Sequence, residues 1–196
     1  LATFFAQNEY SHIAILVDEF TNKYCLPIIQ DLLPSNFTKV LIKSGEHHKN
    51  LATCEQVWDR MTKANMDRHS LLVNLGGGVI GDLGGFCAST YKRGIDFINV
   101  PTTLLAMVDA SVGGKNGVDL GNLKNQVGVI QNPIAVLIDT HYLETLPQSQ
   151  MRSGLAEMLK HGLIQDRAYW TKFGNLSSLN TDDLNELIHQ SVRIKN

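Results

Sequence analysis

The sequence lacks the features that mark several classes of protein. It has only three cysteines, Cys25, Cys54 and Cys87, which are odd in number and have no metal-type spacing. We therefore predict reduced thiols rather than a disulfide framework. No apolar run approaches the roughly 18 residues of a membrane span, and no signal peptide is visible. The prediction is a cytoplasmic protein without a membrane partner.

A strong net charge is also missing. The 17 Lys and Arg residues nearly balance the 19 Asp and Glu residues, which leaves a formal charge of −2. Such a chain has no field that attracts polyanions, so nucleic acid is not expected as a partner. A composition of 43% hydrophobic and 18% charged residues indicates a globular protein. The sequence starts without Met and stops at Asn196 inside an expected helix, so we expect a fragment.

A glycine-rich stretch over residues 75–86 is the most distinctive segment. It follows an apolar run, 71–75, that predicts a buried strand, and it leads into a small-residue helix expected over 86–91. A strand, a glycine turn and a helix N-terminus can hold a pyrophosphate. A tight turn without a ligand would use the same glycines. The usual ribose-binding acid is not in place, because Asp96 precedes the next strand.

Strands and helices alternate along most of the chain. Apolar runs predict strands over 13–17, 39–42, 71–75, 97–100 and 135–139, and helical periodicity is clear over 21–33 and 51–66. This βα alternation predicts an α/β fold, with a Rossmann-like parallel sheet domain over residues 1–147. Purely helical periodicity over 148–164 and 182–195 predicts the beginning of an α-helical domain over 148–196.

Several polar segments follow the expected strands. The loop 44–49 lies at the end of the second strand, where it either reaches a bound nucleotide or simply connects two elements. Pro101 predicts the first turn of a helix, with Thr102 and Thr103 as capping residues. Lys115 follows two glycines, and Lys124 comes nine residues later, an arrangement that suits either anion binding or solvated surface charges.

Glu157 and His161 are four residues apart in an expected helix, so they share one face. This spacing can chelate a metal, but it is more often a plain surface pair. Two residues cannot complete a catalytic zinc site, which normally takes three protein ligands.

Taken together, these segments resemble the 3-dehydroquinate synthase family of sugar-phosphate cyclases. The resemblance covers about residues 13–196 and is strongest in three runs: GGGVIGDLGGF at 76–86, VPTTLLA at 100–106 and VDASVGGK at 108–115. The segments 123–125, 146–147 and 154–160 continue it in the same order. Asn116 is a departure, because the family usually has threonine there.

The resemblance implies NAD as a cofactor and a Zn²⁺ or Co²⁺ ion. The residues it assigns to cofactor binding are Glu19, Ser44, Gly45, Glu46, His47, His48, Lys49, Gly78, Val79, Ile80, Gly81, Asp82, Thr102, Thr103, Asp109, Lys115, Lys124, Tyr142, Leu143, Glu144 and Thr145. Those it assigns to substrate binding and catalysis are Asp109, Lys115, Asn125, Lys160 and Lys195. Glu157 is the implied metal ligand, two further histidine ligands are expected beyond Asn196, and His161 has no implied metal role. Because those two ligands are missing from it, this chain by itself is expected to bind NAD weakly and to be inactive.

The implied reaction converts 3-deoxy-D-arabino-heptulosonate 7-phosphate, a phosphorylated keto-acid, into 3-dehydroquinate and phosphate in the shikimate pathway. A homodimer is also expected. Three alternatives remain at the level of the sequence: another sugar-phosphate cyclase, a polyol dehydrogenase of the same superfamily, or an NAD-binding fragment without activity. A continuous release of NADH would distinguish the dehydrogenase, because a synthase recycles its NAD.

Overall fold

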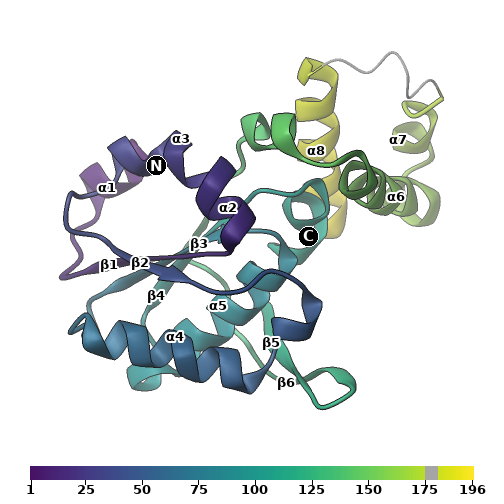
Figure 1. The fold of residues 1–196 in the computed structure, drawn as a ribbon. Coiled ribbons are helices and arrows are strands. Elements are labelled where there is room, and N and C mark those ends of the chain that lie inside the picture. The colour runs from purple at the N-terminus through teal and green to yellow at the C-terminus, as the bar shows by residue number, and fades with distance from the viewer. Residues whose placement is uncertain (175–180) are drawn as a thin grey trace.

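The computed structural model describes residues 1–174 and 181–196. Its centre is a five-stranded sheet with the strand order β2-β1-β3-β4-β7, in which every neighbouring pair is parallel (Figure 1). The strands are β1 (Ile13–Val17), β2 (Thr38–Leu41), β3 (Leu71–Gly76), β4 (Asp96–Pro101) and β7 (Ala135–Val136). The predicted α/β class and parallel sheet are confirmed.

Helices cover both faces of this sheet. In Figure 1, α4 (Leu51–Lys63) and α5 (Gly78–Thr90) lie below it, whereas α1 (Ala2–Gln7), α2 (Glu19–Tyr24) and α3 (Leu26–Ile29) lie above it. Alternate residues of β1 point to opposite faces, so Leu16 packs toward α4 and α5 while Ile15 and Val17 join the other core. Because both faces are buried, all of β1 is apolar.

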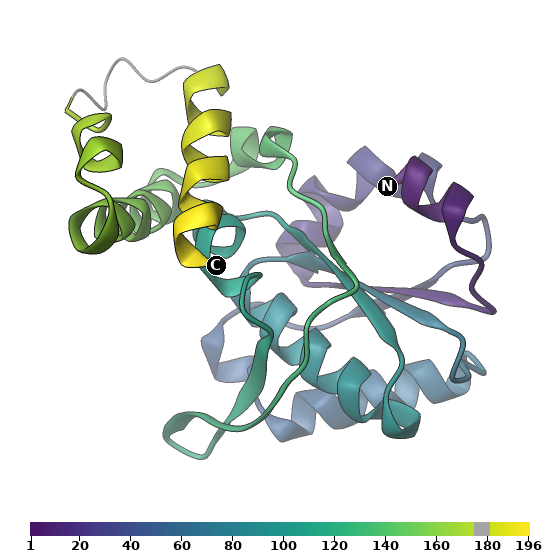
Figure 2. The same ribbon diagram turned by 180° about the vertical axis from the view of Figure 1, so that it is seen from behind.

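The chain ends in three helices, α6 (Gln148–Gln165), α7 (Arg167–Thr171) and α8 (Thr181–Lys195), which are grouped at one end of the sheet (Figure 2). Met158 of α6 and Leu187 of α8 belong to the same hydrophobic cluster as Ile15 and Val73 of the sheet. The predicted division of domains after residue 147 stays a prediction. Within the described ranges, no helix has both the length and the apolar composition needed to cross a bilayer.

Helix α5 approaches the sheet closely because it carries glycine on its inner side. A Cβ atom at Gly84 would lie 2.0 Å from Asn74 Oδ1 and 2.9 Å from Leu16 Cδ2. The helix begins at Gly78, well before the expected start at Phe86, so the glycine-rich stretch is mostly helix rather than turn. This close approach of α5 to the sheet explains why Gly84 is present inside α5, although glycine weakens helices.

Three other local predictions are wrong in part. The helix expected over 21–33 is broken into α2, α3 and the 3₁₀ turn η1 (Gln30–Leu32), since Pro27 has no amide hydrogen with which to continue α2. Pro101 ends β4 instead of starting a helix, but the predicted cap at Thr103 is confirmed, because its Oγ1 accepts a hydrogen bond from the Ala106 amide at 3.2 Å. The strand expected over 135–139 contains only Ala135–Val136, and both residues are half-buried.

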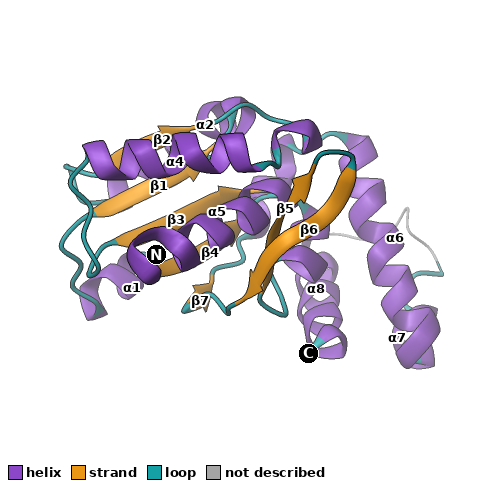
Figure 3. Cartoon of the chain, turned by 90° about the horizontal axis from the view of Figure 1, so that it is seen from below, coloured by secondary structure: helices purple, strands orange, loops and turns teal. Residues whose placement is uncertain are grey.

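A β-hairpin follows Gly114, where the sequence analysis predicted no strand. Its strands, β5 (Lys115–Leu120) and β6 (Leu123–Ile130), are antiparallel and lie beside α5, as Figure 3 shows. Gly113 and Gly114 lie at the entry of the hairpin, and Gly121 lies at its tip. Their φ angles are positive, at 98°, 63° and 59°, a conformation that glycine adopts without steric cost. The hairpin brings Lys115, Lys124 and Asn125 to the carboxyl end of the sheet.

Candidate active site

A cleft of about 810 Å³ opens at the carboxyl ends of β1 to β4. Its walls come from the loop after β2, the first turns of α5, the Thr102–Thr103 segment after β4, and η5 (Thr140–Thr145). Ligands of parallel α/β sheets bind at this edge. The volume lies within the range of roughly 300–1,000 Å³ that is usual for small-molecule sites.

The N-terminus of α5 forms the floor of this cleft. Its N-cap residue is Gly77, and no side chain caps the helix. A Cβ atom at Gly77 would lie 3.1 Å from Thr103 Cγ2, and one at Gly78 would lie 3.3 Å from Ala110 Cβ. The glycines therefore keep the first-turn amide groups uncovered, which is the arrangement that binds a phosphate.

A buried lysine closes one wall of the cleft. Lys49 is only 4% exposed, and its Nζ donates hydrogen bonds to Asp82 Oδ2 at 2.5 Å and to Asn125 Oδ1 at 2.7 Å. Burial raises the pKa of the Asp82 carboxyl, and the Lys49 ammonium opposes this effect. Asn125 has a φ of 53°, and its backbone N–H donates a hydrogen bond to Asp119 Oδ1 at 2.8 Å. Asparagine tolerates this left-handed conformation better than most residues.

Two acids hold the loop after β2. The Ser44 amide donates to Glu19 Oε2 at 2.6 Å, and hydrogen bonds from backbone amides lower the Glu19 pKa. Lys124 of the hairpin pairs with Glu46 Oε1 at 3.1 Å. The loop is therefore tied both to α2 and to β6.

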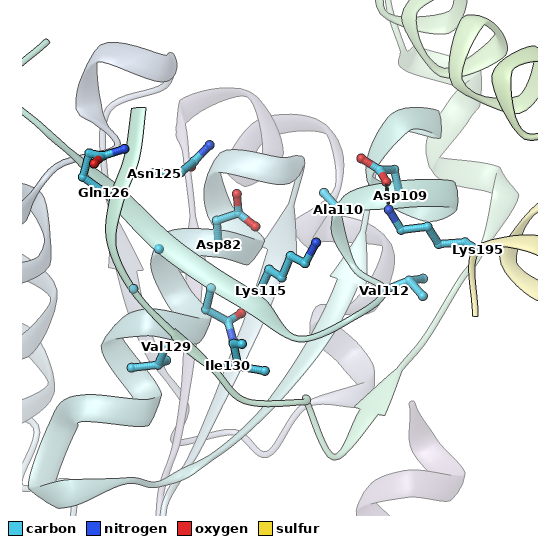
Figure 4. Close-up of a pocket in the computed structure, with 13 residues that line it drawn as sticks. Asp82, Asp109, Ala110, Val112, Lys115, Asn125, Gln126, Val129, Ile130 and Lys195 are labelled. Atoms are coloured by element: carbon cyan, nitrogen blue, oxygen red, sulfur yellow. Dashed lines mark hydrogen bonds and ion pairs between the residues drawn. The ribbon is translucent and has the colours of Figure 1, made fainter. Parts of the chain in front are cut away.

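A second cleft of about 580 Å³ adjoins the first, because Asp82 lines both. Figure 4 shows Lys115 of β5 reaching into it between Asp82 and Asp109. Asp109 lies in η4, a π-helical turn over Ala106–Ala110, a type of turn that is frequent at functional sites. Lys195 of α8 reaches Asp109 from the opposite side, with Nζ 2.5 Å from Oδ1 (Figure 4).

Glu157 and His161 lie next to this second cleft on α6. Glu157 forms an ion pair with Lys160, and its Oε1 lies 3.2 Å from His161 Nε2. His161 is 2% exposed, and its Nδ1 shares a 2.7 Å hydrogen bond with Ser191 Oγ of α8. Burial lowers the pKa of His161. Asp109, Glu157 and His161 each offer one ligand atom, and these atoms all lie within 4.8 Å of one another.

The structure gathers most of the predicted site residues around the two clefts. The predicted cofactor residues that line the larger cleft are Ser44, Gly45, Glu46, Lys49, Gly78, Val79, Ile80, Asp82, Thr102, Thr103, Tyr142 and Thr145. The residues predicted to bind cofactor or substrate that line the smaller cleft are Asp82, Asp109, Lys115, Asn125 and Lys195. Their roles stay predictions, but their convergence fits a cofactor site beside a substrate site.

Other predicted residues lie outside both linings. His47 and His48 face each other with ring centroids 4.1 Å apart, Leu143 is 8% exposed in the core, and Gly81 and Glu144 contribute to neither wall. The sequence analysis also assigned no site role to other residues of the larger cleft, namely Asp18, Phe20, Thr21, Tyr24, Cys25, Gly77, Leu105, Leu146, Pro147 and Gln150. Asp18 had a usable signal, because it directly follows a predicted strand.

The profile of the 3-dehydroquinate synthase N-terminal family matches residues 39–153, which is more than half of the chain. The chain belongs to the 3-dehydroquinate synthase family. A 3-dehydroquinate synthase from Parabacteroides distasonis is 40% identical over 198 residues, covering 100% of this chain and 56% of the relative. One from Halorhodospira halophila is 51% identical over 131 residues, covering 67% of this chain and 37% of the relative. The chain thus spans about half the length of the first of these synthases.

Solved structures of related cyclases have the same fold. The 2-epi-5-epi-valiolone synthase of Streptomyces hygroscopicus subsp. jinggangensis, with NAD⁺ and Zn²⁺ bound, has a TM-score of 0.83 at 28% identity, covering 94% of this chain and 54% of that one. A 2-deoxy-scyllo-inosose synthase, complexed with carbaglucose-6-phosphate, NAD⁺ and Co²⁺, has a TM-score of 0.79 at 27% identity, covering 95% and 54%. Membership of the 3-dehydroquinate synthase family therefore agrees with the fold and with the sequence motifs.

Proposed function

We propose that the protein is a 3-dehydroquinate synthase that converts 3-deoxy-D-arabino-heptulosonate 7-phosphate into 3-dehydroquinate and phosphate, with NAD and a divalent metal. The observation that carries this proposal is the pair of adjoining clefts that share Asp82. One cleft offers an uncapped helix N-terminus, and the other gathers Lys115, Lys195 and Asp109. A cofactor in one cleft and an anionic substrate in the other can therefore both lie next to the Asp82 carboxylate.

The larger cleft fits NAD. The uncapped first turn of α5 would hold the pyrophosphate, and the Thr102 and Thr103 hydroxyls lie beside it. The loop after β2 offers Glu46 as an acceptor for a ribose hydroxyl, a role that Asp96 at the start of β4 cannot fill. When bound, NAD supplies reversible hydride transfer. The protein's part is to hold and orient the cofactor between catalytic cycles.

The smaller cleft fits a substrate with a phosphate and a carboxylate. Lys115 and Lys195 both line it, and Lys160 lies on α6 beside Glu157. Lysine ammonium groups are mobile point charges that offset such anions. Lys195 is paired with Asp109 and Lys160 with Glu157, so the substrate must displace these acids from the lysines.

The residues near Glu157 fit a divalent metal. Glu157, Asp109 and His161 combine two carboxylates with one imidazole nitrogen, a donor set suited to Zn²⁺ or Co²⁺. Glu157 is the residue that would hold the ion. A bound metal supplies Lewis acidity toward hydroxyl and carbonyl oxygens of the substrate.

A second candidate is a related cyclase that acts on another sugar phosphate. The solved cyclase structures favour it only weakly, since they are 27–28% identical to this chain. The curated 3-dehydroquinate synthases are 40–51% identical. We therefore place the synthase first.

The test is to supply the full-length protein with NAD, Zn²⁺ or Co²⁺, and the heptulosonate phosphate, and to measure inorganic phosphate, 3-dehydroquinate and NADH together. The expected result is equimolar phosphate and 3-dehydroquinate without accumulation of NADH. Steady NADH release would instead identify a dehydrogenase, and phosphate release only from a hexose phosphate or another heptulose phosphate would identify the related cyclase. Lys115→Met should abolish turnover, whereas Lys63→Met, an exposed lysine of α4, should not change it.

The homodimer and the cytoplasmic location stay predictions. Sedimentation velocity of the protein at several concentrations tests the first of them.

A further inference from the structure

The two strands of the hairpin are out of step at one place. Strands β5 and β6 are antiparallel, but their register shifts between Val118 and Leu120. Asp119 of β5 therefore lies opposite a bulge over residues 124–126 of β6. A bulge re-aims the side chains that it contains, and bulges are frequent next to active sites. This one contains Asn125, which lines the smaller cleft (Figure 4).

Asp119 belongs to a closed ring of hydrogen bonds with Lys49 and Asn125. The Asp119 backbone N–H donates to the Lys49 carbonyl oxygen at 2.8 Å, and the Asn125 backbone N–H donates to Asp119 Oδ1 at 2.8 Å. Lys49 Nζ closes the ring by donating to Asn125 Oδ1 at 2.7 Å. The three residues come from the loop after β2, from β5 and from β6. Each of them therefore holds the other two in place.

This ring determines how Asn125 presents its side chain. The φ angle of Asn125 is 53°, a left-handed conformation that asparagine tolerates but does not prefer. The charge-assisted bond from its backbone N–H to the Asp119 carboxylate stabilises that conformation. An ammonium group only donates hydrogen bonds, so Lys49 takes Oδ1 of the Asn125 amide. The Nδ2 hydrogens of Asn125 are then left for a ligand in the smaller cleft.

We infer that Asp119 is a positioning residue, whose carboxylate fixes the bulge of β6 so that Asn125 offers Nδ2 as a hydrogen-bond donor to the substrate. This inference rests on the proposed function, which assigns the phosphorylated keto-acid to the smaller cleft. Asp119 itself lines neither of the two clefts, so it acts through Asn125. Its effect on the reaction must therefore vanish when the side-chain amide of Asn125 is absent.

The test uses the full-length protein and two readouts, hydrogen exchange at the Asn125 backbone amide and kcat/KM for the heptulosonate phosphate. Asp119→Ala removes the acceptor of that amide, so exchange should become faster and kcat/KM should fall, each roughly 10-fold or more. Asp119→Asn keeps an acceptor oxygen, so both values should stay within about 3-fold of the wild type.

Asp67→Ala is the matched control. The Asp67 carboxylate also accepts a backbone N–H, from His69 at 2.9 Å, but it lies just before the amino end of β3, at the opposite edge of the sheet from the clefts. Its loss should change neither the exchange at Asn125 nor kcat/KM.

A double variant separates positioning from a general structural role. Asn125→Gly keeps the backbone N–H and the left-handed φ but removes the side-chain amide. If Asp119 acts through that amide, adding Asp119→Ala to Asn125→Gly should change kcat/KM by no more than about 2-fold. Effects that multiply would overturn the inference, and so would an Asp119→Asn variant as impaired as Asp119→Ala.

Failure of the proposed function gives a different result. If the wild type acts only on a different substrate, the synthase proposal is wrong, and the same variants compared on that substrate test Asp119. If the wild type acts on the heptulosonate phosphate while Asp119→Ala changes neither readout, the proposed function stands and the inference about Asp119 is wrong.

Discussion

Lys49 reaches Asp82 with its Nζ atom 2.5 Å from Oδ2, and the same ammonium group also donates to Asn125. The loop after β2, the helix α5 and the strand β6 are thereby joined at one buried charge. Lys49 is 4% exposed, so water does little to screen this pairing. The wall between the two clefts depends on it.

Replacing Lys49 with methionine should destabilise the protein. Met keeps much of the side-chain volume, but it leaves the Asp82 carboxylate without its cation in a site where burial already raises its pKa. Breaking a buried pair by removing one partner costs on the order of 3 kcal/mol. Urea unfolding of Lys49→Met measures this loss. Lys63→Met is the control, because its pair with Asp59 is exposed and contributes under about 1 kcal/mol. Equal effects of the two substitutions would contradict the structural role of Lys49.

Two glycines of α5 should respond in opposite ways to alanine. A Cβ at Gly84 would collide with Asn74 Oδ1 at 2.0 Å, whereas a Cβ at Gly81 would meet no atom within 4 Å. We expect Gly84→Ala to lower the free energy of unfolding by roughly 1–3 kcal/mol. Gly81→Ala should raise it by roughly 0.5–1 kcal/mol through helix propensity. Thermal unfolding checks both substitutions.

The Gly81→Ala variant also tests a predicted cofactor residue. If NAD packs against this helix turn, the stabilised variant should bind NAD more weakly in a calorimetric titration. An unchanged affinity would remove Gly81 from the cofactor site.

Two histidines should titrate on opposite sides of the ordinary value of 6.5. The hydrogen bond with Asp139 raises the pKa of His141, whereas burial lowers that of His161. Proton NMR titration of the metal-free protein measures both midpoints. Asp139→Asn should bring the His141 midpoint down and leave that of His161 unchanged. A common midpoint for the two rings would contradict the structure.

These shifts also give the sign of the effect of pH on stability. For His141, whose folded pKa is raised, the favourable contribution is full below 6.5 and is lost as the pH rises through the folded value. For His161, whose folded pKa is lowered, the unfolded chain binds more protons, so acidification from 6.5 down through the folded value destabilises the protein. Unfolding followed across that interval should show stability falling with acid in the wild type. His161→Gln should flatten this dependence.

The ion pair between Lys195 and Asp109 should matter more for ligand binding than for stability. The two side chains are 31% and 33% exposed, so a double-mutant cycle of unfolding should give a coupling below about 1 kcal/mol. Lys195→Met should nevertheless raise KM for the heptulosonate phosphate, because a cation of the smaller cleft is lost. Arg193→Met, an exposed cation of the same helix turn, is the control and should leave KM unchanged.

The sheet was largely predictable, whereas the hairpin was not. A strand buried on both faces is a continuous apolar run, and Ile13–Val17 and Leu71–Gly76 show this directly in the sequence. The strands β5 and β6 carry Lys115, Asn116 and Gln126 among glycines, so they resemble a polar loop. Their pairing depends on packing against α5, which no local pattern reveals.

The candidate site was predictable as a set of residues but not as a set of contacts. Motif resemblance selected Lys49, Asp82 and Asn125 for the same site, yet it said nothing of the bonds between them. Those bonds join residues 33 and 76 positions apart in the chain. For His161, spacing alone favoured a surface pair over a metal pair. Its burial and its bond to Ser191 decide against the surface pair.

The distance along the sequence between Lys49 and its partner Asn125 also determines when the site can form during synthesis. Asn125 is added 76 residues after Lys49, a delay of roughly 4–15 s at about 5–20 residues per second. Asp82 is added 33 residues into this interval, and until the interval ends the Lys49–Asp82 pair lacks the hairpin. A nascent chain that ends before residue 125 has the glycine-rich helix but an open wall, so tight cofactor binding must wait until β6 is in place.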